Sequence, residues 1–226
     1  MARPWKTLDS EDTPHGALEL RQRSEQEFLI TIAGRVLMNS HANRSELALA
    51  QRVCRALEGR SAPRILIGGL GMGCTLRAAA DGLPAEASIE VSELTPIVAR
   101  WCAGPLADLN KHVLEDSRVT LTIEDVTRSI ANRADDQSRP RLDAILLDLY
   151  EGPHARTNPN RDPFYGKRAL DASRRALAVG GVFAIWSEAP DEAFEKRVKA
   201  IGFKLERFRP GKGGRRHVVY LATRSR

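Results

Sequence analysis

The sequence has no apolar run long enough to cross a membrane. Its longest apolar stretches, at residues 64–68 and 144–147, fall far short of the roughly 20 residues that a spanning helix needs. The first ten residues include Arg3, Lys6 and Asp9, and they lack the apolar segment of a secretory signal. We therefore expect a cytoplasmic protein without a membrane partner.

Cysteine is also scarce. The three cysteines, Cys54, Cys74 and Cys102, are odd in number and widely spaced, and they match no zinc or disulfide pattern. Such usage is typical of a reducing compartment. We interpret the three residues as small buried apolar side chains and expect no metal site.

The chain also lacks a long block of charge of one sign. It has 35 Lys and Arg residues against 29 Asp and Glu residues, a formal charge of +6, and the two signs are interspersed. A basic excess is the usual electrostatic signature of nucleic-acid binding. Here the one dense basic cluster spans residues 207–216, and aromatic residues that could stack on bases make up only 5% of the chain. We therefore expect no nucleic-acid partner.

The length of 226 residues and the hydrophobic fraction of 42% indicate one folded domain with a small appendage. In residues 1–40, β-prone runs at 19–23 and 28–32 and a turn at 33–35 predict a small antiparallel β-hairpin unit. Residues 41–226 form the predicted catalytic domain. It opens with a helix over residues 45–57, where apolar residues recur at helical spacing.

The rest of the chain alternates strands and helices, which predicts a mostly parallel sheet covered by helices on both faces. The expected strands span residues 64–67, 88–92, 119–123, 142–148, 182–187, 204–208 and 217–222. The expected helices span residues 74–80, 96–102, 127–133, 166–178 and 191–201. In such a fold, ligands bind beyond the carboxyl ends of the strands.

The first strand of this domain runs directly into a glycine-rich loop that opens a helix. The loop contains Gly68, Gly69, Gly71 and Gly73. Glycines allow a tight turn and a close approach of the backbone, and a helix N-terminus offers free N–H groups to an anion. The loop lacks the G-x-G-x-x-G spacing of dinucleotide dehydrogenases. We predict a nucleotide-binding loop.

Acids follow the second and third strands. Glu93 stands about twenty residues beyond the glycine loop, where a carboxylate can accept hydrogen bonds from both hydroxyls of a ribose. The alternative is a capping acid ahead of Pro96. Asp125 can accept a hydrogen bond from an exocyclic amine such as that of adenine, or it can cap the following helix.

The fourth strand ends in three groups that can act on a substrate. Asp148, Tyr150 and Glu151 follow the buried run 144–147. Bringing two carboxylates and a phenol to a cleft is costly for structure alone, and these groups could bind an amine and take its proton. The alternative is a loop that carries capping acids.

With these residues in place, the sequence resembles the spermidine synthase family, a branch of the class I S-adenosylmethionine-dependent methyltransferase fold. Residues 68–73 are similar to the family's glycine-rich nucleotide motif, Glu93 matches its ribose-binding acid, and Asp125 falls on the second acid of its adenine-site pair. Asp148 matches the first aspartate of the family's active-site loop, and Glu151 stands where that loop has another aspartate.

The resemblance covers nearly the whole chain. It implies an α/β, Rossmann-like fold with a seven-stranded sheet, together with a β-stranded N-terminal region that is shorter here. The segment at Phe164 and Tyr165 and the run 177–183 also look like the family's gate region and the strand after it.

One residue departs from the family pattern. Gly71 stands where the family's glycine motif carries an aspartate that faces the aminopropyl arm of decarboxylated S-adenosylmethionine. An aspartate there would repel the carboxylate of intact S-adenosylmethionine, and glycine removes that repulsion. The polyamine site is also only partly matched, by Tyr150, Glu151 and Tyr165.

The sequence therefore favours an S-adenosyl-L-methionine-dependent transferase, with methyl transfer to a small, non-polyamine acceptor as the leading expectation. Asp148 would orient or deprotonate the acceptor, with Tyr150 and Glu151 shaping its pocket. Three alternatives stay open: a spermidine-forming aminopropyltransferase that uses decarboxylated S-adenosylmethionine, transfer or cyclisation of the aminocarboxypropyl arm, and a non-catalytic nucleotide-binding or RNA-binding module. The acceptor is expected to be a small molecule, and the protein a monomer or a homodimer.

Overall fold

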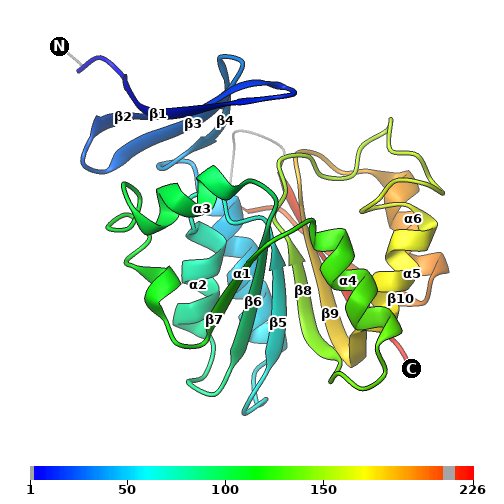
Figure 1. Cartoon of the computed structure of the whole chain (residues 1–226). Coiled ribbons are helices and arrows are strands. Elements are labelled where there is room, and N and C mark those ends of the chain that lie inside the picture. The colour runs from blue at the N-terminus through cyan, green and yellow to red at the C-terminus, as the bar shows by residue number, and fades with distance from the viewer. Residues whose placement is uncertain (1–2, 211–216) are drawn as a thin grey trace.

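The computed structural model describes residues 3–210 and 217–226, which form two sheets. The N-terminal sheet is antiparallel, in the order β1-β2-β3-β4. Its strands are β1 (Lys6–Thr13), β2 (Gly16–Ser24), β3 (Glu27–Ile32) and β4 (Arg35–Asn39). It lies across one end of the larger domain (Figure 1).

The central sheet has seven strands in the order β10-β11-β9-β8-β5-β6-β7. β11 is antiparallel to both of its neighbours, and the pairings from β9 to β7 are parallel. The strands are β5 (Arg64–Gly68), β6 (Ser88–Glu93), β7 (Val119–Ile123), β8 (Leu142–Leu147), β9 (Leu177–Ser187), β10 (Phe203–Phe208) and β11 (Val218–Arg224). The order reverses between β5 and β8, where α/β sheets open a crevice for ligands.

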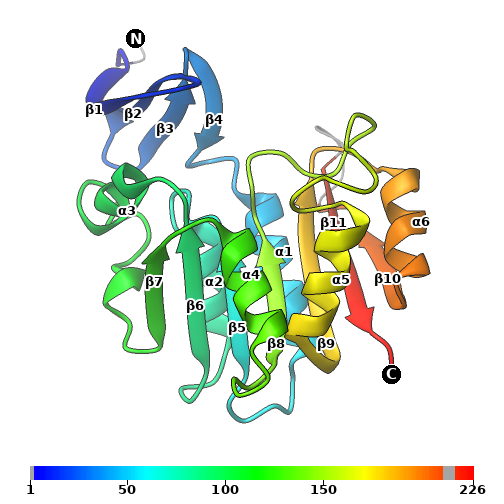
Figure 2. The ribbon, with the colours of Figure 1, turned by 45° about the vertical axis from the view of Figure 1, so that its right-hand side comes forward.

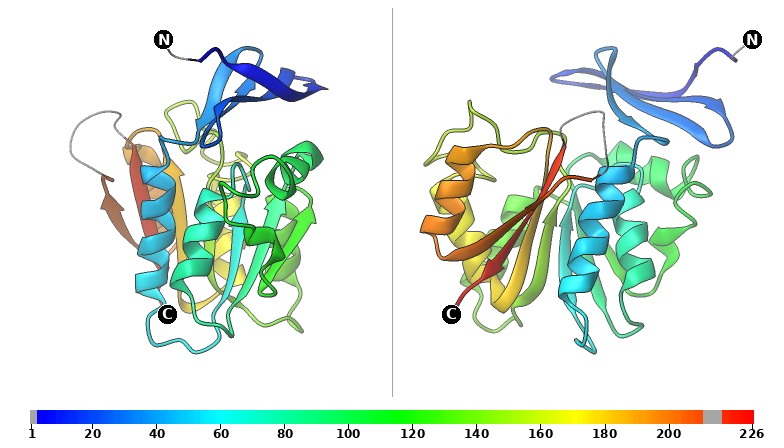
Figure 3. Two further views of the ribbon diagram at one scale, coloured as in Figure 1. Left: turned by 90° about the vertical axis from the view of Figure 1, so that its left-hand side faces the viewer. Right: turned by 180° about the vertical axis from the view of Figure 1, so that it is seen from behind.

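Helices cover both faces of this sheet (Figures 2 and 3). The helices are α1 (Arg44–Ala56), α2 (Cys74–Gly82), α3 (Pro96–Ala103), α4 (Val126–Asp135), α5 (Lys167–Ala176) and α6 (Glu192–Ala200), with a short 3-10 helix at Val113–Glu115. Alternate strand residues bury against opposite layers: Ile65 and Ile67 join the core under α1 and α2, whereas Leu66 joins the core under α4 and α5. None of the described helices is long and apolar enough to span a bilayer.

The N-terminal sheet is fastened to the larger domain through α3. Trp101 Nε1 donates to Asp9 Oδ2 at 2.9 Å, and Arg100 pairs with Glu11 at 3.1 Å. Leu20 and Phe28, which are buried in the small sheet, belong to the same core as the α1 and α2 face of the central sheet. The small sheet is therefore held above the carboxyl ends of β5, β6 and β8.

The predicted strands and helices are confirmed, with two corrections. The N-terminal unit is a four-stranded sheet rather than a hairpin, because the mostly exposed and polar β1 shows no apolar alternation. β9 begins at Leu177, in the predicted end of a helix, and a register shift opposite β8 accommodates Gly180 at φ +74°.

The prediction that all three cysteines are buried is wrong for two of them. Cys102 is buried, while Cys54 and Cys74 are partly exposed. The predicted basic loop at residues 211–216 lies outside the described residues.

Candidate active site

The glycine-rich loop joins β5 to α2 at the centre of the carboxyl edge. Gly69, Gly71 and Gly73 have φ of +90°, +53° and +81°, a region that favours glycine. A Cβ at Gly69 would lie 2.5 Å from the backbone oxygen of Asp148, so the loop and the end of β8 are in close contact. The glycines therefore let neighbouring segments lie directly against the loop backbone in front of α2.

Gly71 differs from the other loop glycines in what it faces. A Cβ there would lie 2.5 Å from Met38 Sδ and 2.7 Å from Met38 Cε. The thioether of β4 therefore fills the space that a side chain at position 71 would enter. Nothing in the local sequence pairs these two residues, because they are 33 positions apart, with Met38 on β4 and Gly71 in the loop after β5.

Glu93 ends β6 and ties the glycine loop to that strand. Its side chain is buried, with the residue 7% exposed. Oε2 accepts from Leu70 N and Oε1 accepts from Thr95 N, both at 2.8 Å. An ionised carboxylate has about four acceptor positions, so about two remain for a ligand. The arrangement combines a capping role with capacity for two hydroxyl donors.

Asp125 follows β7 as the N-cap of α4. Its Oδ1 accepts from Thr127 N at 2.9 Å. The capping alternative is thus observed, and the second carboxylate oxygen retains its acceptor positions. Next to it, Glu124 N donates to Glu93 O at 3.0 Å, which holds the ends of β6 and β7 together.

Asp148 comes directly after β8, one residue beyond the strand's last residue. Its Oδ2 accepts a 2.5 Å hydrogen bond from Thr75 Oγ1, on the first turn of α2. Burial raises the pKa of Asp148 to about 7, the negative charge of Glu46 on α1 also raises it, and the Thr75 hydrogen bond lowers it. A carboxylate with a pKa near neutrality is suited to proton transfer.

Tyr150 and Glu151 lie further out than Asp148, and neither hydrogen-bonds it in the described residues. Tyr150 is 44% exposed, and its ring lies 5.6 Å from the guanidinium carbon of Arg35 on β4. The exposed Glu151 carboxylate is 3.8 Å from His154 Nε2. The Glu151 backbone oxygen accepts from the hydroxyl of Tyr165 at 2.9 Å. Tyr165 is therefore a buried support of the loop.

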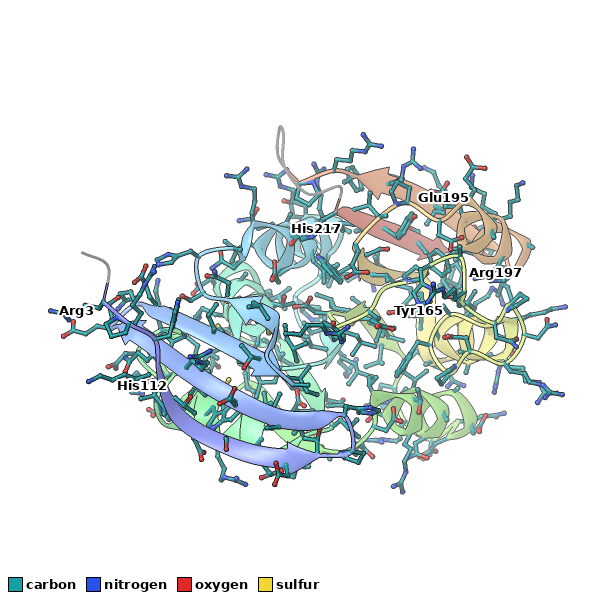
Figure 4. The ribbon with its side chains drawn as sticks, turned by 90° about the horizontal axis from the view of Figure 1, so that it is seen from above. Arg3, His112, Tyr165, Glu195, Arg197 and His217 are labelled. Atoms are coloured by element: carbon teal, nitrogen blue, oxygen red, sulfur yellow. The ribbon has the colours of Figure 1, made fainter. Side chains whose placement is uncertain are left out.

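A polar group that sequence analysis missed lies beside Asp148. Glu46 accepts from Ser45 Oγ at 2.7 Å, and Ser45 Oγ is 3.2 Å from His217 Nδ1. The imidazole of His217 meets the Trp186 ring edge to face at 5.1 Å. Figure 4 shows His217 beside the beginning of α1.

Only a weak signal in the sequence points to these residues. Glu46 is an acid in the first turn of a helix, where the helix dipole alone favours it. Trp186 lies near the end of β9 and resembles any core aromatic, yet its buried Nε1 finds no acceptor within the described part of the chain. A buried indole N–H without an acceptor suits a site that a ligand completes.

The edge therefore contains two sets of groups. Beyond β5, β6 and β7 lie the glycine loop, Glu93 and Asp125. Beyond β8, β9 and β11 lie Asp148 and the polar group of Ser45, Glu46, His217 and Trp186. The first set can receive a nucleoside, and the second can act on a group placed above Asp148.

No protein-family model matches the sequence, and no curated protein matches it. The chain is, however, similar to several solved structures. Spermidine synthase from Thermotoga maritima aligns with a TM-score of 0.73 and 15% identity, over 97% of this chain and 73% of that one. A spermidine synthase in complex with the transition state analogue AdoDATO aligns with a TM-score of 0.70 and 15% identity, over 97% and 72%.

Human methyltransferase-like protein 13 in complex with SAH aligns with a TM-score of 0.61 and 20% identity, over 81% of each chain. The chain therefore has the spermidine synthase-like, class I methyltransferase fold, as the sequence predicts. The seven-stranded sheet with one antiparallel strand and the added N-terminal sheet agree with that fold.

Proposed function

We propose that this protein is a transferase that binds S-adenosyl-L-methionine at the carboxyl edge of the central sheet and transfers its methyl group to a small acceptor. The observation that carries the proposal is the hydrogen bond from Leu70 N to Glu93 Oε2. It joins the glycine-rich loop and the acid after β6 into one cradle, of the shape and chemistry that a nucleoside needs. The solved structures of this fold include one in complex with SAH and one in complex with AdoDATO, which supports such a ligand.

Three parts of the carboxyl edge each bind a different portion of the donor. Glu93 takes the ribose hydroxyls through its remaining acceptor positions, and Asp125 takes the adenine amine through the oxygen that the cap does not use. The loop at Gly69, Gly71 and Gly73 takes the sulfonium and amino-acid part, because the glycines add no side chain of their own and Met38, which packs on Gly71, is uncharged. The N-terminus of α2 follows directly and favours a carboxylate there.

The choice of intact donor rests on position 71. A carboxylate at this position would repel the carboxylate of intact S-adenosylmethionine, and the residue here is glycine with the uncharged Met38 beside it. The adjoining loop therefore carries no negative charge that selects the decarboxylated form.

The donor supplies an activated leaving group, so the protein's task is alignment and proton handling. Asp148 holds the acceptor and receives its proton at the carboxylate, for which its pKa of about 7 is suited. Thr75 keeps that carboxylate in place through one hydrogen bond. Glu46, whose charge acts on Asp148, and the Trp186 indole N–H, which finds no acceptor in the described residues, are the further groups that we assign to the acceptor side.

A polyamine aminopropyltransferase that uses decarboxylated S-adenosylmethionine is the second candidate. The observation that favours it is the negative charge around the acceptor side, where Asp148, Glu46 and the exposed Glu151 would attract a cationic amine. A third candidate, transfer or cyclisation of the aminocarboxypropyl arm, uses the same intact donor as methyl transfer.

The nucleoside product distinguishes these reactions. The protein is incubated with intact or decarboxylated donor and a panel of small amines, carboxylates and alcohols, and the products are identified by mass spectrometry. The proposal predicts S-adenosylhomocysteine from the intact donor. Methylthioadenosine from the decarboxylated donor would establish aminopropyl transfer instead, and methylthioadenosine from the intact donor would establish transfer of the larger arm.

A further inference from the structure

A cavity lined by arginines lies at the end of the central sheet opposite the candidate active site. It has a volume of about 360 Å³ and is lined by Ala134, Asp135, Gln137, Arg141, Arg175 and Arg224. Arg141 immediately precedes β8, and Arg224 ends the antiparallel β11, so both lie at the amino edge of the parallel strands. Figure 1 shows the C-terminus at this end, away from the N-terminal sheet.

The arginines of this cavity outnumber its acids. The carboxylate of Asp135 is 2.7 Å from Arg175, which also pairs with Asp171 at 3.1 Å. Arg141, Arg224 and the neighbouring Arg174 have no carboxylate within ion-pair distance among the described residues. Two of the three cationic side chains that line the cavity therefore have no neutralising carboxylate among the described residues.

The hydrogen bonds of Arg141 and Arg224 account for only part of their donors. Arg141 Nη1 donates to the carbonyls of Arg133 and Ala134 at the end of α4. Arg224 Nη1 donates to the carbonyls of Arg174, near the end of α5, and Leu177, which follows that helix. Each guanidinium has five N–H donors, and the Nη2 of both finds no acceptor in the part of the chain that the structure describes. These carbonyls thus hold the two side chains in place and leave the Nη2 group of each guanidinium available to a ligand.

The clustered charges affect one another. Burial lowers the pKa of Arg224, and the charges of Arg174 and Arg141 lower it further. In addition, the buried Nε atoms of Arg174 and Arg224 have no acceptor within the described residues. Like charges held together without a counter-charge destabilise the protein until an anion occupies the space between them.

We infer that this cavity is a binding site for a small multivalent phosphate anion, recognised by the guanidinium groups of Arg141 and Arg224. A planar guanidinium matches two oxygens of a phosphate, and two such forks on different elements can grip a diphosphate from two sides. The volume accommodates a diphosphate and not a folded polynucleotide. The site is separate from the proposed transferase site and does not depend on that function.

The test is calorimetric titration of the full-length protein with inorganic pyrophosphate at constant ionic strength. Saturable binding of one pyrophosphate per chain is expected. Arg141→Gln should weaken that binding at least fivefold. Arg224→Lys keeps the charge but loses the planar guanidinium that can bind two phosphate oxygens, and it should weaken binding two- to threefold.

The matched control is Arg168→Gln, which removes the same charge from an exposed position at the opposite end of α5. This variant should bind pyrophosphate within twofold of the wild type. If it loses as much affinity as Arg141→Gln, the binding is a general property of a basic surface and the inferred site is wrong. Absence of saturable binding to the wild type would equally overturn the inferred site.

Two further measurements are made. The first distinguishes weaker binding from lower stability, and the second distinguishes a small anion from RNA as the ligand. The rise in melting temperature caused by pyrophosphate is measured against each variant's own unliganded value, so a variant that is merely less stable still shows the full rise. A short single-stranded RNA is titrated in parallel. RNA binding that exceeds pyrophosphate binding and is weakened equally by all three variants would contradict a small-anion site.

Discussion

The two halves of the carboxyl edge hold their acids in different ways. In the donor half, beyond β5, β6 and β7, backbone N–H groups fix the carboxylates: two bind Glu93 and one binds Asp125. In the acceptor half, beyond β8, β9 and β11, one side-chain hydroxyl fixes Asp148 beside the charge of Glu46. Backbone donors stabilise an ionised acid, whereas burial and a second acid raise its pKa.

This difference indicates a division of labour. A carboxylate held by the backbone keeps its place whatever side chains surround it, which suits a donor common to many reactions. A carboxylate held by side chains changes its position and proton affinity when those side chains change, which suits an acceptor particular to one enzyme. Substitutions in the two halves test this division.

The largest effect is expected at Asp148. Asp148→Asn removes the proton acceptor and should lower turnover roughly a hundredfold or more, while donor affinity stays within a few-fold. Steady-state kinetics and calorimetry with the intact donor measure the two quantities. Loss of donor binding that matches the loss of rate would place Asp148 in the donor half instead.

The free energy of unfolding of Asp148→Asn is measured as a control for the folding of this variant. The pKa of Asp148 is about 7 in the folded protein and near 4 when unfolded, so the native state binds its proton more tightly. The stability that this proton gives is complete below pH 4 and is lost as the pH rises to 7. Asp148→Asn does not titrate, so its advantage over the wild type should grow by roughly 2–4 kcal/mol between pH 4 and pH 7 and then level off. Urea unfolding across this range measures it.

The next largest effect is expected at Glu93. Each charge-assisted hydrogen bond to a ribose hydroxyl contributes about 1.5–3 kcal/mol, so Glu93→Gln should weaken donor binding at least tenfold. Gln is the milder change, because it keeps one acceptor oxygen and sets an NH2 group against the other backbone N–H, whereas Ala leaves both Leu70 N and Thr95 N unpaired. The melting temperature of the ligand-free variant is therefore measured alongside. The matched control is Glu151→Gln in the acceptor half, for which calorimetry should give donor affinity within twofold of the wild type.

A smaller effect is expected at the boundary of the two sheets. Met38→Ala makes room for a side chain at position 71, where φ is +53° and Asp or Asn is better tolerated than most residues. On that background, Gly71→Asp should shift the donor preference toward the decarboxylated form by about 1–2 kcal/mol relative to Gly71→Asn. The Asn variant carries the same shape and strain without the charge. Equal donor affinities for the two variants would refute the electrostatic role of position 71.

The smallest effects concern the pH dependence of kcat/KM. The rate should rise with pH through about 7, as Asp148 loses its proton. Thr75→Val removes the hydrogen bond that lowers this pKa, so the rise should move to higher pH. Glu46→Gln removes the charge that raises it, so the rise should move to lower pH. Each shift is expected to be about one pH unit or less, and Thr75→Ser should leave the profile unchanged.

The donor half was more predictable from sequence than the acceptor half. Glu93 and Asp125 end strands whose apolar patterns are clear, and they lie at the predicted edge because parallel strands bring their carboxyl ends together. Their assigned roles remain predictions. Asp148 was found by the same logic, as the residue that follows a fully buried strand.

Contacts between distant segments could not be read from the sequence in either half of the edge. Met38 reaches Gly71 from another sheet, and Thr75 reaches Asp148 from 73 residues away. No periodicity marks either pair, because each depends on how two sheets or two connections meet in space. The arginine cavity is hidden for the same reason, since Arg141 and Arg224 are far apart in sequence.

The measurement that tests the proposed donor most directly is calorimetric titration of the wild-type protein with intact and with decarboxylated S-adenosylmethionine. Glycine at position 71 and the neighbouring Met38 leave no acid to repel the donor's carboxylate or to bind the shorter arm. We therefore predict saturable binding of both forms, with the intact donor bound at least tenfold more tightly. Tighter binding of the decarboxylated donor, or binding of neither, would contradict the proposed function.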